Sequence, residues 1–187
     1  MSGGSHDDAV CAIAYRDADG RGVLARVLDQ GQPAPFDPRK AVERFVTVLR
    51  EYRITSVVGD KYAGETFLHD FLRHHIQYDV AGIPAGKIYE ALEPYLNAHE
   101  IMLLDDPETE SQFLGLIWRG GKIDHAAGEK DDRANACAGA LLLALDPAPP
   151  VETEMTDDEA DAIRRMFLFP GYISGIPANE IGPNFFA

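Results

Sequence analysis

Two adjacent aspartates, Asp131 and Asp132, stand immediately before an almost uninterrupted apolar run in the stretch "GEKDDRANACAGALLLAL". A further carboxylate, Asp60, follows the β-branched run "ITSVVG". Carboxylates at a strand end and at a helix start, once brought together by a fold, offer the oxygen ligands that Mg²⁺ and Mn²⁺ prefer. Two such ions commonly cut phosphodiesters, because one activates a water and the other stabilises the leaving oxygen. The residue types therefore indicate metal-dependent phosphodiester hydrolysis.

Each carboxylate also has a simpler interpretation. An Asp at a helix N-terminus stabilises the helix by capping and through the dipole, which alone explains one of the pair Asp131 and Asp132. Asp60 is equally placed for a turn before "KYAGE", and Asp7 and Asp8 suit solvated turns. The sequence contains no P-loop, no His-Glu-x-x-His zinc motif and no Gly-x-Ser-x-Gly elbow, so it offers none of these alternative catalytic motifs.

Composition limits the class of protein. The 187 residues are 45% hydrophobic, which is enough for one domain with a substantial core. The net charge of -14 argues against generic attraction to nucleic acid or anionic lipid. Cys11 and Cys137 lie in apolar surroundings and suit free thiols in a reducing compartment. Because no apolar run is long enough to span a bilayer and no signal peptide is recognisable, we expect a soluble cytoplasmic protein without a membrane partner.

The pattern of apolar residues predicts a mixed α/β sheet flanked by helices. Two strands joined by an Asp-Gly turn come first, and a helix begins after Asp37 and Pro38. Strands and helices then alternate, ending in a core helix. The expected strands are 9–16, 22–30, 54–60, 76–84 and 101–106, and the expected helices are 36–53, 64–75, 86–100, 107–118 and 131–145.

The composition changes after residue 146. Residues 151–161 carry six acidic and no basic side chains, which indicates a linker. A short helix at about 157–168 and an aromatic, Gly/Pro-punctuated tail are expected to follow, and the tail would dock on this domain or on a partner chain. We therefore expect a domain over 1–146 and an appended segment over 147–187.

Three stretches, in order and with similar gaps, resemble the C-terminal nuclease domain of phage large terminase proteins. They are "VVGDKYAGE" (57–65), "GKIYEALEPYLNAHEIMLLDDPETESQFLGL" (86–116) and "IDHAAGEKDDRANACAGALLLAL" (123–145). The resemblance covers about residues 2–146. It implies a ribonuclease H-like fold, shared with resolvases and integrases, that binds two Mg²⁺ or Mn²⁺ ions and cuts double-stranded DNA during genome packaging. It also implies a phage or prophage protein acting in the bacterial cytoplasm with other terminase or portal components.

The resemblance assigns roles by position. Asp60 takes the second acidic position of the family, and Asp132, with Asp131 beside it, takes the third, so all three are expected to be catalytic and to bind metal. Glu65 and His125 are outer candidates. Basic residues in or near the motifs could contact DNA locally in spite of the acidic total, although ordinary surface cations explain them equally well. These are Lys61, Lys87, Lys122, Lys130 and Arg133, with Arg119 nearby.

The chain also departs from the family pattern. The segment "SGGS" (2–5) matches the residues directly after the family's first acidic residue, so that acidic residue and its central strand would lie upstream of Met1. Asp7 or Asp8 could substitute for the missing ligand. Lys130 stands where the family often has His. Three hypotheses result. The chain is a two-metal endonuclease impaired by the loss of one ligand, or a catalytically inactive module for assembly or DNA contact, or a helper protein unrelated to nucleases.

A sheet without its central strand would expose two edges, which folded proteins rarely tolerate. We therefore expect the gap to be filled by the N-terminal residues, by the C-terminal tail or by another copy of the chain in a homo-oligomer. The sequence does not choose among them.

Overall fold

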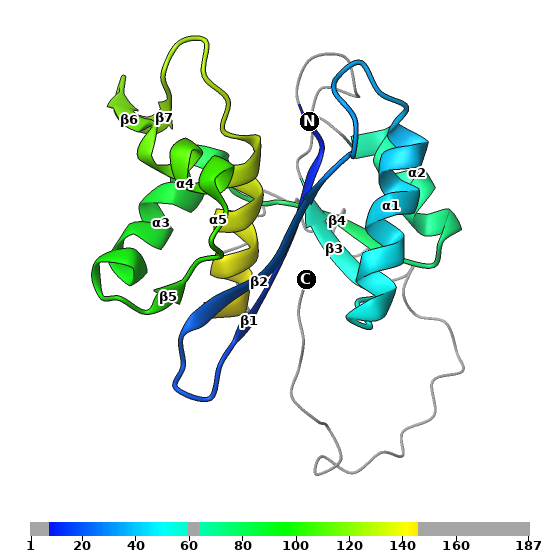
Figure 1. Ribbon diagram of the computed structural model, residues 1–187, viewed down its shortest axis with the longest axis horizontal. Coiled ribbons are helices and arrows are strands. Elements are labelled where there is room, and N and C mark those ends of the chain that lie inside the picture. Colours follow the sequence, from blue (N-terminus) through cyan, green and yellow to red (C-terminus); the bar gives the residue numbers. More distant parts are fainter. Residues whose placement is uncertain (1–7, 60–63, 146–187) are drawn as a thin grey trace, which may run out of the picture.

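The computed structural model describes residues 8–59 and 64–145 (Figure 1). Seven strands and five helices occur in this part of the chain. The strands are β1 (Val10–Arg16), β2 (Gly22–Asp29), β3 (Ser56–Gly59), β4 (Gln77–Val80), β5 (Ile101–Met102), β6 (Leu116–Arg119) and β7 (Lys122–His125). The helices are α1 (Pro38–Glu51), α2 (Gly64–Arg73), α3 (Ala85–Asn97), α4 (Pro107–Leu114) and α5 (Asp132–Leu145).

The β1–β2 hairpin runs between two groups of helices (Figure 1). Successive side chains of a strand point to opposite faces, and the hairpin uses both faces. Ile13 and Leu28 join a core with α1, α2, β3 and β4. Ala14 and Leu24 join a second core with α3 and α5. The hairpin is therefore the layer shared by two hydrophobic cores.

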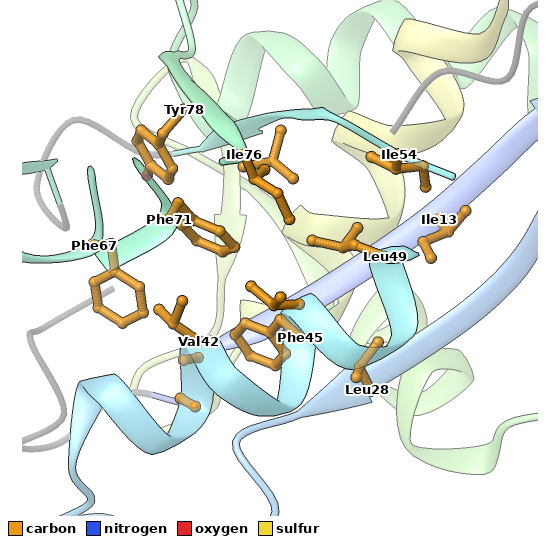
Figure 2. Close-up of a cluster of buried hydrophobic side chains, with 14 of the residues drawn as sticks. Ile13, Leu28, Val42, Phe45, Leu49, Ile54, Phe67, Phe71, Ile76 and Tyr78 are labelled. Carbon is orange, nitrogen blue, oxygen red and sulfur yellow. The ribbon is translucent and has the colours of Figure 1, made fainter. Parts of the chain in front are cut away.

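The first core is built on the apolar face of α1 (Figure 2). The helix starts as expected, because the Asp37 side chain accepts a hydrogen bond from the Arg39 amide and Pro38 occupies the first turn. Phe45 and Leu49 are almost fully buried, and Phe67 of α2 packs into the same cluster. Burying each of these side chains stabilises the fold by roughly 1.5–3 kcal/mol.

The second core surrounds α5, whose buried face is made largely of Ala with Cys137, Leu141 and Leu145. Small side chains let α5 approach the hairpin closely. Gly22 of β2 illustrates the fit, since a Cβ added there would lie 3.0 Å from the Leu145 side chain. Cys11 and Cys137 are both free thiols, as the sequence predicted.

Two predicted elements were wrong in extent. The helix expected over 107–118 ends at Leu114, and Leu116–Arg119 instead forms β6, paired antiparallel with β7. Gly115 caps the helix, and Gly120 and Gly121 both adopt positive φ in the connecting turn. Glycine tolerates this backbone conformation, so the Gly-Gly pair makes a hairpin turn. The strand expected over 101–106 is reduced to the two residues of β5.

The strands form three separate small sheets within the described residues. β1 pairs with β2, and β2 pairs with β5 in parallel. β3 and β4 form their own parallel pair. No strand of the described chain joins β1 to β3, which agrees with the expectation that a central strand is lacking. None of the helices in residues 8–59 and 64–145 is long and apolar enough to cross a membrane.

Candidate active site at the start of α5

The first turn of α5 is capped by a side chain from another helix. The amides of Arg133 and Ala134 donate to Oε1 of Gln112, at 2.8 and 3.1 Å. Gln112 lies on α4, about twenty positions earlier in the chain. The first amides of a helix lack intrahelical partners, and an acceptor here normally comes from a neighbouring Asp, Asn, Ser or Thr. Because Gln112 fills this role, helix capping does not require Asp131 or Asp132.

Asp131 is held by a tyrosine of α3. The Tyr89 hydroxyl donates to Oδ2 of Asp131 at 2.9 Å, and the Tyr89 side chain is almost fully buried. Burial raises the pKa of the Tyr89 phenol, and the negative charges of Asp131, Asp132 and Asp124 raise it further. Tyr89 therefore stays protonated and acts as a fixed hydrogen-bond donor to the carboxylate. The charges of all three aspartates therefore act on this ring.

Asp132 lies beside the start of β1. Its Oδ2 accepts a hydrogen bond from the Asp8 amide at 3.1 Å, although the two residues are 124 positions apart. The Asp8 carboxylate in turn accepts hydrogen bonds from Gln30 and Lys130, both at 2.8 Å. Burial raises the pKa of the Asp8 carboxyl, but these hydrogen bonds and the Lys130 charge outweigh it, so the net pKa is lowered. Asp8 is thus ionised and paired with a cation at the edge of the site.

His125 and Asp124 come from the end of β7. The His125 ring lies with Nδ1 2.9 Å from the Ala126 carbonyl oxygen, and this contact raises the pKa of the imidazole. Burial lowers the pKa of the imidazole, while the charges of Asp131, Asp124 and Asp132 raise it. The Asp124 carboxyl has a lowered pKa, chiefly because Lys122 donates a hydrogen bond to it. The structure therefore places His125 within the electrostatic reach of the Asp131 and Asp132 pair.

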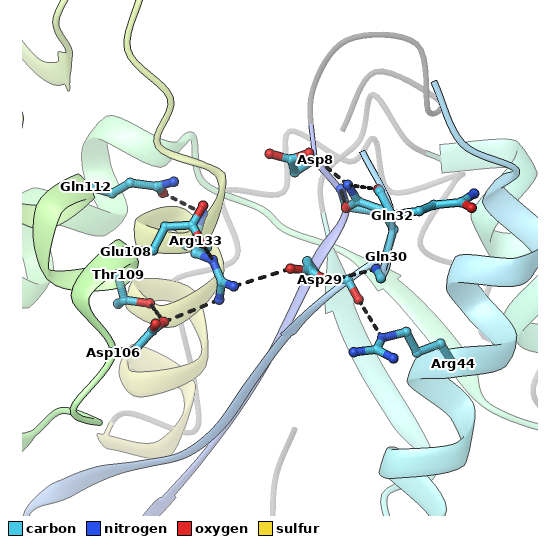
Figure 3. A network of polar contacts seen from close by, with 12 residues as sticks. Asp8, Asp29, Gln30, Gln32, Arg44, Asp106, Glu108, Thr109, Gln112 and Arg133 are labelled. Carbon is cyan, nitrogen blue, oxygen red and sulfur yellow. Dashed lines mark hydrogen bonds and ion pairs between the residues drawn. The ribbon is translucent and has the colours of Figure 1, made fainter. Parts of the chain in front are cut away.

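Arg133 is a central cation that ties three elements together (Figure 3). Its guanidinium contacts Asp29 of β2 at 3.3 Å, Asp106 at 3.3 Å and Glu108 of α4 at 2.9 Å. The Arg133 side chain is only 14% exposed. This geometry supports a structural role, because the planar fork is already engaged by carboxylates. Its predicted contact with DNA remains a prediction.

The other residues predicted for the site are distributed as follows. Lys87 pairs with Glu90 at 2.7 Å, and Lys122 pairs with Asp124 at 2.6 Å. Arg119 ends β6 and is exposed. Asp60, Lys61 and the Glu65 side chain lie outside the described residues, as does Asp7. β3 ends at Gly59, and Gly59 lines the same groove as Asp8 and Asp132. The end of β3 and the start of α5 thus open onto one space.

The donor set suits a hard divalent cation in type, because Asp131 and Asp132 supply carboxylate oxygens. Within residues 8–59 and 64–145, however, there is no group of three or more His, Cys, Asp or Glu side chains placed to hold a metal ion. Two carboxylates at the start of α5 would need a further ligand from elsewhere in the chain. Asp60, which follows Gly59 directly in the sequence, is the residue predicted to supply it.

Several residues of the site were not identified from the sequence. Tyr89 carries a weak signal, since it is an aromatic residue on the buried stripe of an expected helix. Gln112 and Gln30 carry none, because their partners are twenty or more positions away.

No protein-family model matches the chain, and no curated protein matches it by sequence. Among solved structures, the chain is similar to the large terminase nuclease from the thermophilic phage G20c. The likeness has a TM-score of 0.56 at 12% sequence identity and covers 73% of this chain and 82% of that one. At this identity the likeness establishes the fold. The chain therefore has the ribonuclease H-like architecture that the resemblance of its motifs implied.

Proposed function

We propose that the chain is a metal-dependent DNA endonuclease of the terminase type, with its active site at the start of α5. The observation that carries the proposal is the division of roles in that first turn. Gln112 caps the helix, while Asp131 and Asp132 are held by Tyr89 and by the Asp8 amide. Two adjacent carboxylates fixed on a buried helix are well suited to bind cations with little reorganisation. The fold shared with a terminase nuclease supports this function.

Each described residue has a distinct part in the proposed site. Asp131 and Asp132 hold divalent cations together with Asp60, and Tyr89 orients Asp131. Bound cations would supply an activated water and stabilise the leaving oxygen of the DNA strand. His125, whose pKa is raised and whose side chain is 40% exposed, is available to contact a phosphate of the DNA. Mg²⁺ and Mn²⁺ both fit the all-oxygen donor set.

The second candidate function is a catalytically inactive module that contacts DNA or other packaging components. One observation favours it. The Lys130 ammonium forms an ion pair with Asp8 at 2.8 Å, next to the carboxylate of Asp132. The Lys130 ammonium partly neutralises the negative charge of the nearby carboxylates. It therefore competes with a metal ion for these carboxylates.

Cleavage of supercoiled plasmid distinguishes the two functions. The full chain is incubated with plasmid and Mn²⁺ or Mg²⁺, and nicked and linear products are followed over time. Loss of an outer partner of a metal ligand typically costs 10–100-fold, so loss of a ligand should cost at least about 100-fold. We expect this loss for Asp132→Asn, Asp131→Asn and Asp60→Asn. The matched control is Asp105→Asn, an exposed aspartate before α4, which should retain full activity.

DNA retention on a native gel completes the test. An unmodified chain that retains DNA but never cuts it supports the inactive module. A chain that does neither contradicts the nuclease and also an inactive module that acts through DNA contact. If each of the three aspartate variants still cleaves DNA, the active site does not lie at the start of α5. Lys130→Met adds a direct comparison. If Lys130 competes with metal, this variant reaches half-maximal cleavage at a lower Mn²⁺ concentration.

A further inference from the structure

A groove with a volume of about 720 Å³ lies between β1 and β3 and is lined mainly by apolar groups. Cys11 and Ala12 of β1 form one wall, and Val58 and Gly59 of β3 form the other. α5 lines it with Ala136 and Gly139. The two strand walls lie on either side of the space in which the described chain has no strand.

Both walls have a strand edge available. All seven residues of β1 pair with β2 on the opposite edge. All four residues of β3 pair with β4 on the opposite edge. Within the described residues, the edges that face the groove pair with no strand. Val58 is accordingly 41% exposed in spite of its apolar side chain. Open edges beside an apolar surface are the arrangement that accepts an added strand.

The face that α5 presents to the groove allows a backbone to approach closely. Three of the α5 residues that line the groove are small, namely Ala136, Gly139 and Ala140. A Cβ added at Gly139 would meet nothing within 4 Å. The open space at Gly139 therefore belongs to the groove. An extended segment can lie over this face while its amides and carbonyls reach the two edges.

We propose that the segment Gly171–Ile176 of this same chain, "GYISGI", occupies the groove as a strand between β1 and β3. Tyr172, Ile173 and Ile176 are residues with high strand propensity. Pro170 and Pro177 bound the segment, and proline is tolerated at the ends of a strand that is paired on both sides. The segment has about the length of β3 and β4.

The other end of the chain fits the groove less well. Residues 1–7, "MSGGSHD", contain one large apolar side chain, so they cannot cover an apolar surface of this size. The length of the intervening chain permits the proposed docking. α5 ends at Leu145, and Leu142 and Leu143 line the groove. The extended reach of residues 146–170 is roughly 80 Å, far more than the groove requires.

Hydrogen exchange on the full chain gives the first test. We expect the amides of 171–176 to be protected at least about 10-fold more than those of the acidic stretch 151–161. The variant Gly139→Leu places a bulky side chain in the groove at a position where an added Cβ meets nothing within 4 Å, and should abolish this protection while leaving α5 itself protected. Ile173→Asp should also abolish it, whereas Ile181→Asp, a matched change elsewhere in the tail, should not. Unprotected 171–176 amides in the unmodified chain would overturn the proposal.

Disulfide trapping identifies the source of the strand. In a Cys11→Ala background, Val58→Cys combined with Ser174→Cys should form an intramolecular bridge under mild oxidation. Leu72→Cys, on the exposed face of α2 away from the groove, is the control partner and should not form one. Cys137 is fully buried and does not interfere. A bridge that appears only between two molecules, with light scattering showing a dimer, would mean that a second copy of the chain occupies the groove, and would contradict the proposal.

Neither hydrogen exchange nor disulfide trapping depends on DNA cleavage, so the proposed nuclease function and this inference can fail separately.

Discussion

The hydroxyl of Tyr89 donates a hydrogen bond of 2.9 Å to Oδ2 of Asp131, across 42 positions of sequence. Tyr89, the donor, is part of the second core, and Asp131, the acceptor, is part of the candidate site. This single contact makes the position of a carboxylate depend on the packing of α3 against α5.

Removal of the Tyr89 hydroxyl should therefore weaken both stability and the site. Tyr89→Phe keeps the ring but leaves a partly buried carboxylate without its donor, and hydrogen bonds to charged groups contribute about 1.5–3 kcal/mol. We expect the free energy of unfolding in urea to fall by about this amount. Tyr95→Phe, on the same helix and partly buried in the same core, is the control and should change it little. Equal losses in both variants would show that the Asp131 contact is not what Tyr89 contributes.

The cap provided by Gln112 makes a separate prediction. Gln112→Ala removes the acceptor for two amides of α5, and the loss of a helix cap costs about 0.5–2 kcal/mol. The expected result is a lower unfolding midpoint in urea, with faster hydrogen exchange at Arg133 and Ala134. Ser111→Ala, at the exposed neighbouring position, should leave both measurements unchanged. Unchanged exchange at these two amides in Gln112→Ala would show that another group can cap α5.

The Arg133 cluster should be important for stability. Arg133→Met leaves Asp29, Asp106 and Glu108 without their shared cation. Because the three carboxylates are partly exposed and can be solvated, we expect a loss of about 1.5–3 kcal/mol, the usual contribution of hydrogen bonds to charged groups. Glu108 is 59% exposed, so Glu108→Gln should cost less than about 1 kcal/mol. Urea unfolding of both variants measures the difference. A small loss in the free energy of unfolding for Arg133→Met would show that these ion pairs contribute little. The Arg133 guanidinium of the unmodified chain would then be available for the predicted DNA contact.

The titration of His125 tests the electrostatics of the site. Its pKa is raised above the ordinary value of 6.5, mainly by the contact with the Ala126 carbonyl and then by Asp131, Asp124 and Asp132. A folded-state pKa above the unfolded value stabilises the fold below about pH 6.5, and this contribution is lost as the pH rises through the folded pKa. NMR of the imidazole C–H signals should show the raised pKa. Asp131→Asn should lower it, and Asp105→Asn should not.

Local sequence signals predicted most of the elements. The Asp37-Pro38 start of α1 and the alternating strands of the hairpin each depend on neighbouring residues, and both are found in the structure. The β6–β7 hairpin was missed, because Leu116–Arg119 is apolar enough to extend the pattern of α4. Gly115 and the following Gly-Gly pair were the available signals for a break.

The site was less accessible to sequence reasoning than the fold. The position of Asp131 and Asp132 at a helix start was predicted, because it depends on the apolar run that comes after them. The contacts that hold them depend on residues far away in the chain, namely Asp8, Tyr89 and Gln112. Such contacts are set by how helices and strands pack, and no periodicity in the sequence encodes them.

The division of the fold into two cores has a consequence for the order in which the chain folds during synthesis. Every buried residue of the first core lies between Ala9 and Tyr78. The second core cannot close until α5, the last described helix, has left the ribosome. N-terminal units generally fold first during translation. The hairpin would therefore be fixed on one face first. Its other face, with Ala14 and Leu24, would be covered only when α5 folds. Because Asp131 and Asp132 stand at the start of α5, the candidate site is assembled last.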